Sequence, residues 1–521
     1  MTVTVTGASG TLTITPGTGD VLNLAEQIRN LLQTVSDTKR LQIVSDTAGG
    51  SSLPLAPPLS GTHTSILDLT SSVAYDATIP AEYSYVVNDT SAPSTLTGSN
   101  VTIISGTVGA SINVSGLSTV AAVGGDNTVS AGGNYVLSFG PGNNEVNAHG
   151  TGTVATGSGQ STIVSAGAGD NLILSNGTND LIVAATGSST VFATGSNAGV
   201  LGSGGQLVAV MSGDGATVAA GQSNTTVTIS GGQAVVFGGG TPAGDLNLDN
   251  SGGNTTIATF GSNASVNSSG DSALIFGGSG TTNLTLSGSN STVVGGTGAS
   301  TITASGPNGE LIFGGTGAIS YLGGAGTATL VGTTGAKEDI TVGSGGVVFA
   351  TGVNNSATIT GGTGESTIFG GSGSIVNFVG SQGAADFLAG AGNETLNAAG
   401  SSTANILSGG SAGGNASLAG GSGDDTFFVG NGSDTLSGDA GRNIFAFFDG
   451  ATGGHDYITD FSTSDSVYLI GYASTGSATA LQNAATVDSN GITLTLSDST
   501  QVTFSNLTDR AQLDGHILYA R

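Results

Sequence analysis

The chain has 521 residues, of which 93 are Gly, and a formal net charge of −27 although only 8% of its residues are charged. It has no Cys, which excludes disulfides, and its seven Lys and Arg residues are too few to neutralise a phosphate backbone, which excludes nucleic acid as a partner. So much Gly without a three-residue period excludes collagen and favours turn-rich repeats.

Residues 1–100 lack the glycine rhythm of the rest. Alternating residues over Thr2–Val5 and Thr11–Ile14 predict strands, and GDVLNLAEQIRNLLQTV predicts a helix that Asp20 caps. A further strand is expected over Tyr83–Val87. We expect a small α+β domain over residues 1–100, serving either as a cap on the repeats or as an attachment module.

The first residues have neither the basic nor the apolar region of a Sec signal. No apolar run in the chain approaches 18 residues, so we also expect no membrane span.

A phrase repeats between about residues 101 and 450: an aromatic or aliphatic residue, then Gly-Gly-small-Gly. Examples are FGGSG from Phe276, FGGTG from Phe313 and FGGSG from Phe369. The first glycines fall at 277, 295, 314, 323, 361, 370 and 420, at spacings close to multiples of nine. This is a repeat period and not a general enrichment in glycine.

Each nine-residue unit is expected to be a short strand followed by a turn that has no room for side chains. Two units make one coil of about eighteen residues, and coils stack through parallel pairing. In TTVTISGGQAVVFGGG and ESTIFGG we expect Thr and Ser outward and Val, Ile and Phe inward. The predicted fold is therefore all-β: a parallel, β-roll-like β-solenoid over 101–450, with the α+β N-terminal domain before it and a β-rich C-terminal cap over 451–521.

The sixth residue of each unit tests for calcium, because Ca²⁺ needs six to eight oxygen ligands and glycine carbonyls supply only part of them. In the middle of the chain the sixth residues carry no charge, so we expect a solenoid without metal there. These residues are Thr282, Ser300, Ile319, Ala328, Ser366 and Ile375.

Near the C-terminus the same test succeeds. GGSGDDTFF, which begins at Gly420, fits the calcium-binding nonapeptide G-G-x-G-x-D-x-U-x, and Asp425, Asp434 and Asn443 follow one another at nine-residue spacing over 420–446. Two units apart, Asp425 and Asn443 are expected to share one Ca²⁺. The carbonyls of four turn residues complete that predicted site: Gly421, Gly423, Asp439 and Gly441. Asp434 faces the other side, between Ala416 and Thr452, and its site is incomplete unless Asp449 helps.

A weaker group near the start of the repeats offers Asn127, Asn144, Asn171 and Asp180. Its bias toward Asn favours hydrogen-bonded turns over calcium sites.

The C-terminal segment resembles the repeat-in-toxin (RTX) family, the hemolysin-type calcium-binding repeat proteins of Gram-negative bacteria. GGHDYITDFSTSDSVYL (Gly453–Leu469) is similar to the closing motif of that family, with Asp456, Asp460 and Asp465 in corresponding positions. NGITLTLSDSTQVTFSNLT predicts a hairpin after it. The resemblance implies a type I secretion signal in the last fifty residues and folding on Ca²⁺ outside the cell.

Nothing in the sequence indicates an enzyme. The four His residues are dispersed, no HExxH helix is present, and the acidic pairs that a glycosidase needs are sparse. The candidates are Asp245/Asp249, the trio Lys337–Glu338–Asp339 (interpreted as a solvated ion cluster) and Glu365/Asp386/Glu394. His455 beside Asp456 is interpreted as a turn contact.

We expect a secreted structural or interaction protein of the cell surface or extracellular matrix, such as a surface-layer, biofilm-scaffold or adhesin-like protein. Its expected partners are further copies of itself, the type I secretion apparatus and a cell-surface glycan. The alternative is a polysaccharide-active enzyme or a carbohydrate-binding solenoid. Ice binding is disfavoured because the T-x-T pattern is irregular.

Overall fold

The structure, a computed structural model, is an all-β parallel β-solenoid of about 22 turns with very little helix, which confirms the predicted fold class. It divides into two compact units, Met1–Ile257 with Gly261–Ala264 and Ala258–Phe260 with Ser265–Arg521. The residues it describes are 3–7, 10–14, 30, 41–55, 64–184, 186–240, 244–379, 382–410, 413–450, 453–472 and 478–520.

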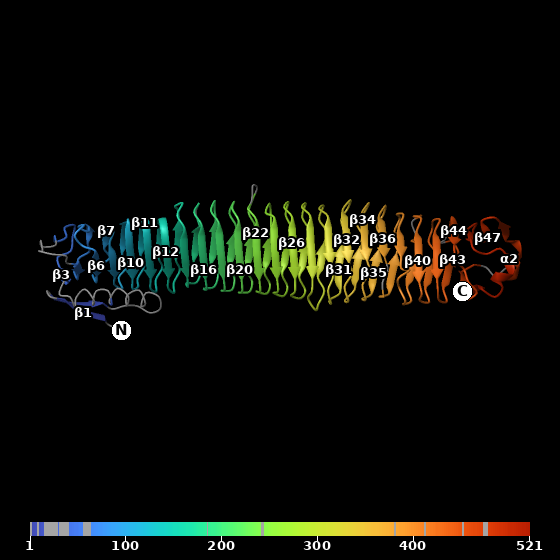
Figure 1. The fold of residues 1–521 in the computed structure, drawn as a ribbon, viewed down its shortest axis with the longest axis horizontal. Helices are drawn as coiled ribbons and strands as arrows, with labels where there is room; N and C mark the ends of the chain where they lie inside the picture. The colour runs from blue at the N-terminus through green and yellow to red at the C-terminus, as the bar shows by residue number, and fades with distance from the viewer. Residues whose placement is uncertain are drawn as a thin grey trace. The chain divides into compact units, whose positions relative to one another are not determined.

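In the first unit a parallel ladder follows one short antiparallel hairpin, β1–β2 (Figure 1). The strands are β1 (Val3–Gly7), β2 (Gly10–Ile14), β3 (Leu41–Asp46), β4 (Thr64–Leu69), β5 (Asp76–Thr78), β6 (Tyr85–Asn88), β7 (Thr95–Ser99), β8 (Thr102–Ser105), β9 (Ser111–Ser115), β10 (Leu117–Ala122), β11 (Thr128–Phe139), β12 (Glu145–Thr156), β13 (Thr162–Ser165), β14 (Asn171–Ser175), β15 (Leu181–Ala184), β16 (Ser189–Ala193), β17 (Gly199–Gly202), β18 (Leu207–Met211), β19 (Thr217–Ala219), β20 (Thr225–Ile229), β21 (Val235–Phe237) and β22 (Leu246–Asn250), with β23 (Thr256–Ala258) and β24 (Ala264–Ser268) next in the sequence.

The second unit continues the same scheme and ends in a cap. Its elements are β25 (Leu274–Phe276), β26 (Thr282–Leu286), β27 (Thr292–Val294), β28 (Ser300–Ala304), β29 (Leu311–Phe313), β30 (Ile319–Leu322), β31 (Ala328–Val331), β32 (Lys337–Thr341), β33 (Val347–Ala350), β34 (Ser356–Thr360), β35 (Ser366–Phe369), β36 (Ile375–Val379), β37 (Ala385–Leu388), β38 (Thr395–Asn397), β39 (Ile406–Ser408), β40 (Ser417–Gly421), β41 (Thr426–Phe428), β42 (Thr435–Asp439), β43 (Ile444–Phe448), β44 (His455–Ile458), β45 (Ser466–Ile470), α2 (Ala478–Ala484), β46 (Thr486–Asp488), β47 (Gly491–Thr495), β48 (Gln501–Phe504), the 3₁₀ turn η1 (Arg510–Leu513) and β49 (Ile517–Ala520).

One coil contains two strands, because a strand pairs in parallel with the strand two places along the chain. The register joins Asn171 of β14 to Ser189 of β16, and Thr282 of β26 to Ser300 of β28, so a turn takes about 18 residues. From β13 to β45 the odd-numbered strands therefore form one face of each unit and the even-numbered strands another, whereas β3 pairs with β4 and the long strands β11 and β12 pair with each other. The predicted coil of two nine-residue units is confirmed.

The parallel ladder begins earlier than residue 101, where the glycine rhythm starts. β3 pairs with β4, β4 with β6, and β5 with β7. Parallel strands can pair without Gly-Gly turns, because Gly-Gly is needed only where the turns of successive coils approach one another closely. The first coils can therefore belong to the ladder although they lack the Gly-Gly-small-Gly repeat. The helix predicted over residues 19–35 lies, apart from Asn30, outside the described residues.

Inward side chains form a thin aliphatic core. Val227, Val236 and Ile368 are buried, as the alternation predicts. The prediction is wrong for the residue before Gly-Gly: Ser366 is buried, whereas Phe369 is 42% exposed. Because side chains alternate along a strand, Ile368 and Phe369 cannot both face inward.

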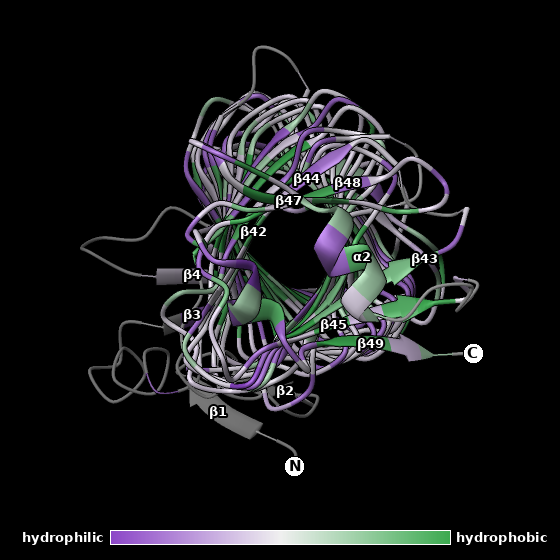
Figure 2. Cartoon of the chain, turned by 90° about the vertical axis from the view of Figure 1, so that its right-hand side faces the viewer, coloured by the Kyte–Doolittle hydropathy of each residue, from purple (hydrophilic) through white to green (hydrophobic). Residues whose placement is uncertain are grey.

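The predicted C-terminal hairpin is confirmed. β47 pairs antiparallel with β48, joining Ile492 to Phe504, and β48 pairs in parallel with β44 of the last coil. Seen from this end, α2 lies across the last coils (Figure 2). Phe461 packs edge-on against Phe504, with ring centroids 5.0 Å apart, and closes the core beneath the cap.

Candidate functional site

Two columns of side chains occupy the turn position where the nonapeptide places its Asp. The Asp425 column contains the residues that the register of the odd-numbered strands aligns with Asp425, and the Asp434 column is its counterpart on the even-numbered strands. In the last turns the Asp425 column contains Asn405, Asp425, Asn443 and Asp465. The Asp434 column contains Glu394, Ala416, Asp434 and Asp456.

The Asp425 column is a chain of hydrogen bonds from turn to turn. Asp425 Oδ1 accepts the backbone N–H of Asn405 at 2.8 Å, and Asn443 Oδ1 accepts that of Asp425 at 3.0 Å. Asp465 Oδ1 accepts the N–H of Asn443 at 2.9 Å. The structure thus brings Asp425 and Asn443 together on successive turns, as their spacing predicts.

The Asp434 column is completed by Asp456, a residue that the sixth-residue count did not assign to it. Asp434 Oδ1 accepts the N–H of Ala416 at 2.8 Å, and Asp456 Oδ1 accepts the N–H of Asp434 at 2.9 Å. Thr452 lies outside the described residues. The closing motif pointed to Asp456, but the longer connection before β44 placed it beyond the nine-residue count.

Several carboxylate oxygens in these columns are buried without a hydrogen-bond donor. Among the aspartates they are Asp425 Oδ2 and Asp456 Oδ2, and both carboxylate oxygens of Glu394 also have none. Burial raises the pKa of Asp425 to about 6 and that of Asp456 to about 8, because a charged carboxylate loses its water shell. Asp425 Oδ2 faces Gly420, where a Cβ would overlap it. The first glycine of the nonapeptide therefore makes room for this carboxylate.

The predicted backbone ligands lie in the stacked turns around Asp425. The register pairs Gly421 with Asp439, and a Cβ on Gly441 would overlap Gly423 O. Gly421 O accepts Ala440 N–H at 3.0 Å, so its second lone pair remains for another donor or a cation.

The side chain of Asp439 is exposed and serves the turn locally, since Asp439 Oδ1 accepts from Ser437 Oγ at 3.0 Å. Asp460 of the closing motif binds the same turn: Asp460 Oδ1 accepts Gly438 N–H at 2.9 Å and Asp460 Oδ2 accepts Asp439 N–H at 2.6 Å.

Within the described ranges no three His, Asp or Glu side chains converge as a metal site. A cation here would have to be held by one carboxylate and several turn carbonyls, which is the ligand set that the nonapeptide supplies. The donor-free Oδ2 of Asp425 fits that set.

The middle of the chain differs from the prediction in two respects. Val376 and not Ile375 enters the Asp434 column, and Ile375 is 58% exposed, because the turn before β36 is one residue longer than the count assumes. The columns also hold charge there: Glu310 lies in the Asp425 column, and Glu338 and Glu394 lie in the Asp434 column.

These glutamates are buried, and burial raises the pKa of Glu310 to about 7 and raises the pKa values of Glu338 and Glu394. The interpretation of Lys337–Glu338–Asp339 as a solvated cluster is wrong for Glu338, which points inward from β32 while its two neighbours face solvent.

The Asn-rich group near the start of the repeats forms hydrogen-bonded turns, as its composition predicts. Asn127 Oδ1 accepts Ala110 N–H at 3.1 Å, and Asn171 Nδ2 donates to Gly169 O at 2.9 Å. Asp180 Oδ1 accepts Ser161 N–H at 2.6 Å. Asp180 Oδ2 accepts Gly177 N–H at 3.1 Å and also the hydroxyl of Ser175. Both carboxylate oxygens of Asp180 are therefore satisfied by the protein.

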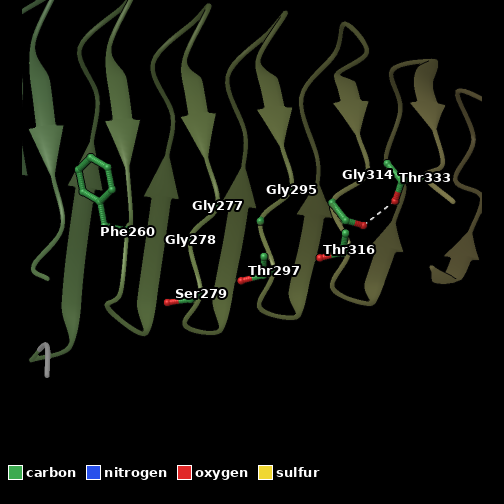
Figure 3. A pocket seen from close by; sticks show the side chains of 11 residues that line it. Phe260, Gly277, Gly278, Ser279, Gly295, Thr297, Gly314, Thr316 and Thr333 are labelled. Carbon is green, nitrogen blue, oxygen red and sulfur yellow. Dashed lines mark hydrogen bonds between the residues drawn. The ribbon is translucent and has the colours of Figure 1, made fainter. Parts of the chain in front are cut away.

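A groove of about 650 Å³ runs over stacked Gly-Gly turns of the second unit (Figure 3). Its floor is three glycine pairs that begin at Gly277, Gly295 and Gly314, and hydroxyls of Ser279, Thr297 and Thr316 follow one edge. Phe260, 53% exposed, lies at one end. At the other end Thr333 Oγ1 donates to Gly315 O at 2.6 Å.

His455 takes part in a surface contact. His455 Nε2 lies 2.7 Å from Thr503 Oγ1, and the His455 ring stacks on Tyr457. Asp456 points inward from the same strand, so the two side chains occupy opposite faces of β44.

No protein-family model matches this chain, and a search of curated proteins finds no similar sequence. No helix among the described residues is long and apolar enough to cross a membrane.

Proposed function

We propose that this chain is an extracellular structural protein, a β-solenoid that serves as a surface-layer or matrix scaffold and whose C-terminal end is stabilised by Ca²⁺. The observation that carries the calcium part is the donor-free, buried Oδ2 of Asp425 inside a nonapeptide turn. Secretion by a type I system from a Gram-negative bacterium rests on the resemblance of residues 420–521 to the RTX family.

The physical case for calcium is the free-energy cost of leaving Asp425 Oδ2 buried without a partner. A buried carboxylate is unfavourable when one of its oxygens has neither a donor nor a counter-ion, so the Asp425 carboxylate favours binding a proton or a cation at Oδ2. Outside a cell Ca²⁺ is the abundant hard cation that prefers carboxylate and carbonyl oxygens. Bound there, Ca²⁺ supplies folding free energy to the last coils, with Asp425, Asn443 and the turn carbonyls as its ligands.

The case for a scaffold is that the described chain is built of strands that stack from coil to coil. The regular elements in the described parts of the chain are mostly short strands, and the helix α2 has only seven residues. Repeats of this kind provide extended surfaces for assembly.

Calcium titration of the purified chain tests the proposal. We expect saturable binding and a rise in the unfolding temperature, both lost in Asp425→Ala/Asp456→Ala. Asp424→Ala is the matched control, because Asp424 is the exposed neighbour that pairs with Arg442 at 3.4 Å. Electron microscopy then tests the scaffold: ordered sheets or filaments that disperse on chelation support it, and a monomer at every concentration contradicts it.

A carbohydrate-binding solenoid is the second candidate, favoured by the groove in Figure 3, where an exposed aromatic ring and a row of hydroxyls provide the two contacts that sugars use. Binding of a neutral polysaccharide that is lost in Phe260→Ala would support it.

A further inference from the structure

The last residues of the odd-numbered strands form a partly exposed apolar stripe on one face of the second unit. The register aligns them from β25 to β35, one per strand: Phe276, Val294, Phe313, Val331, Ala350 and Phe369. Strands in a sheet lie about 4.8 Å apart, so the stripe is about 24 Å long. Leu388 of β37 continues it and is 48% exposed.

The fold does not require this stripe. On the even-numbered face of the same unit the corresponding outward residues are mostly polar, including Thr285 of β26, Thr301 of β28 and Thr358 of β34. Threonine suits an exposed strand as well as phenylalanine does, so the apolar residues have another role. The even-numbered face has three exposed apolar side chains of its own: Leu322, Ile375 and Val379.

We propose that the stripe is the contact through which a second copy of this chain packs, face to face, against the first. This inference rests on the proposed scaffold function and names the surface that performs it. The stripe itself carries no charge. A basic partner would therefore be attracted to the acidic parts of the molecule and not to this face.

Shape also favours a second copy. With a two-fold axis at Val331, Phe313 of one copy lies over Ala350 of the other and Phe369 lies over Val294, so each of these rings meets a small side chain. At one end of the stripe Phe369, Leu388, Ile406 and Phe428, together with Asp386, line a hollow of about 260 Å³, with room for a large side chain. A self-complementary surface of this kind makes an isologous, two-fold contact.

The stripe forms the apolar centre of a contact whose remaining area comes from its rim. Its three phenylalanines bury about 200 Å² each when covered and are about 40% exposed, so together they offer roughly 240 Å². Val331 and Leu388 add smaller areas, and a standard interface buries about 800 Å² per partner. Threonines beside the stripe, such as Thr292, Thr329 and Thr367, supply a polar rim.

Sedimentation velocity of the full chain over a range of concentrations tests the contact. We expect Phe313→Thr/Phe369→Thr to weaken self-association at least tenfold. The control Ile375→Thr/Val379→Thr removes a comparable exposed apolar area from the even-numbered face and is expected to leave association unchanged. Thermal unfolding confirms that both variants fold.

A second measurement uses the absence of cysteine in the chain. Val331→Cys lies at the centre of the stripe and its continuation, whereas Thr358→Cys lies on the even-numbered face. Under mild oxidation we expect the first variant to form disulfide-linked dimers at least tenfold faster than the second.

The outcomes separate the two proposals. If the wild type assembles but both double variants assemble equally well, or both Cys variants cross-link at the same rate, the stripe is not the contact and the scaffold function stands. If the wild type remains a monomer at every concentration, both are overturned.

Discussion

Asp180 in the first unit and Asp425 in the second occupy the same turn position and have opposite environments. Both Oδ1 atoms accept a backbone N–H from the neighbouring turn. Asp180 Oδ2 accepts three further donors, whereas Asp425 Oδ2 has none. An Asp at this turn position can therefore have both carboxylate oxygens hydrogen-bonded by the protein, or it can have one oxygen that requires a proton or a cation. The number of hydrogen-bond donors around the carboxylate decides between the two.

The strongest test of this difference is the dependence of stability on pH with and without Ca²⁺. Burial raises the folded-state pKa of Asp425 from 3.8 to about 6 and that of Asp456 to about 8, so the folded chain binds these protons more tightly than the unfolded chain does. Without metal, the contribution of these two groups to stability is greatest below pH ~4, and it is lost as the pH rises through their folded-state pKa values. At about 1.4 kcal/mol per pKa unit, the loss by pH ~8 amounts to several kcal/mol.

Calcium should remove most of this loss, because the cation replaces the protons. Thermal unfolding across the pH range, in chelator and in Ca²⁺, measures the difference. Glu310, whose pKa is raised to about 7, provides a comparison: Glu310→Gln should remove a part of the loss that calcium does not restore. Identical pH profiles with and without Ca²⁺ would show that Asp425 and Asp456 bind no ion.

The next test removes the carboxylate of Asp180 and the hydrogen bonds that it accepts. Asp180→Ala leaves the buried N–H groups of Ser161 and Gly177 without acceptors, and we expect it to destabilise the chain by about 2–4 kcal/mol. The loss should be the same in chelator and in Ca²⁺. Chemical denaturation measures it, with Asp170→Ala, an exposed aspartate in the same unit, expected to lie within about 0.5 kcal/mol of the wild type. A loss that depends on Ca²⁺ would place an ion at Asp180 as well.

The sequence predicts the positions of these carboxylates only in part. Glycine spacing and alternation are local signals, so they predict the coil, the C-terminal hairpin and the position of Asp425 beside Asn443. They fail where a turn changes length by one residue, because a one-residue shift exchanges the inward and outward sides of a strand. For that reason the count selects Ile375 as a sixth residue where Val376 occupies the column, and it misses Glu310 and Glu338, whose turns depart from the nine-residue spacing.

The sequence also does not predict which side chains donate hydrogen bonds to each carboxylate. Ser175 and Thr156 reach Asp180 across neighbouring strands, and neither belongs to the glycine motif. The expectation that Phe369 faces inward fails because its neighbour Ile368 occupies the core and alternation turns Phe369 outward. The same alternation turns the last residue of each odd-numbered strand from β25 to β35 outward, which forms the apolar stripe.

The smallest expected effect concerns the glycine that makes room for Asp425. A Cβ on Gly420 would overlap Asp425 Oδ2, so we expect Gly420→Ala to displace the carboxylate and to weaken calcium binding by about 1–2 kcal/mol, the usual cost of one methyl group too many. Gly240→Ala is the control, because a Cβ there meets nothing within 4 Å. In an Asp425→Ala background the methyl group at position 420 has room, so the two substitutions should cost less stability together than the sum of their separate effects. Additive costs would mean that Gly420 is needed for its backbone alone, and that the first glycine of the nonapeptide has no part in positioning the carboxylate.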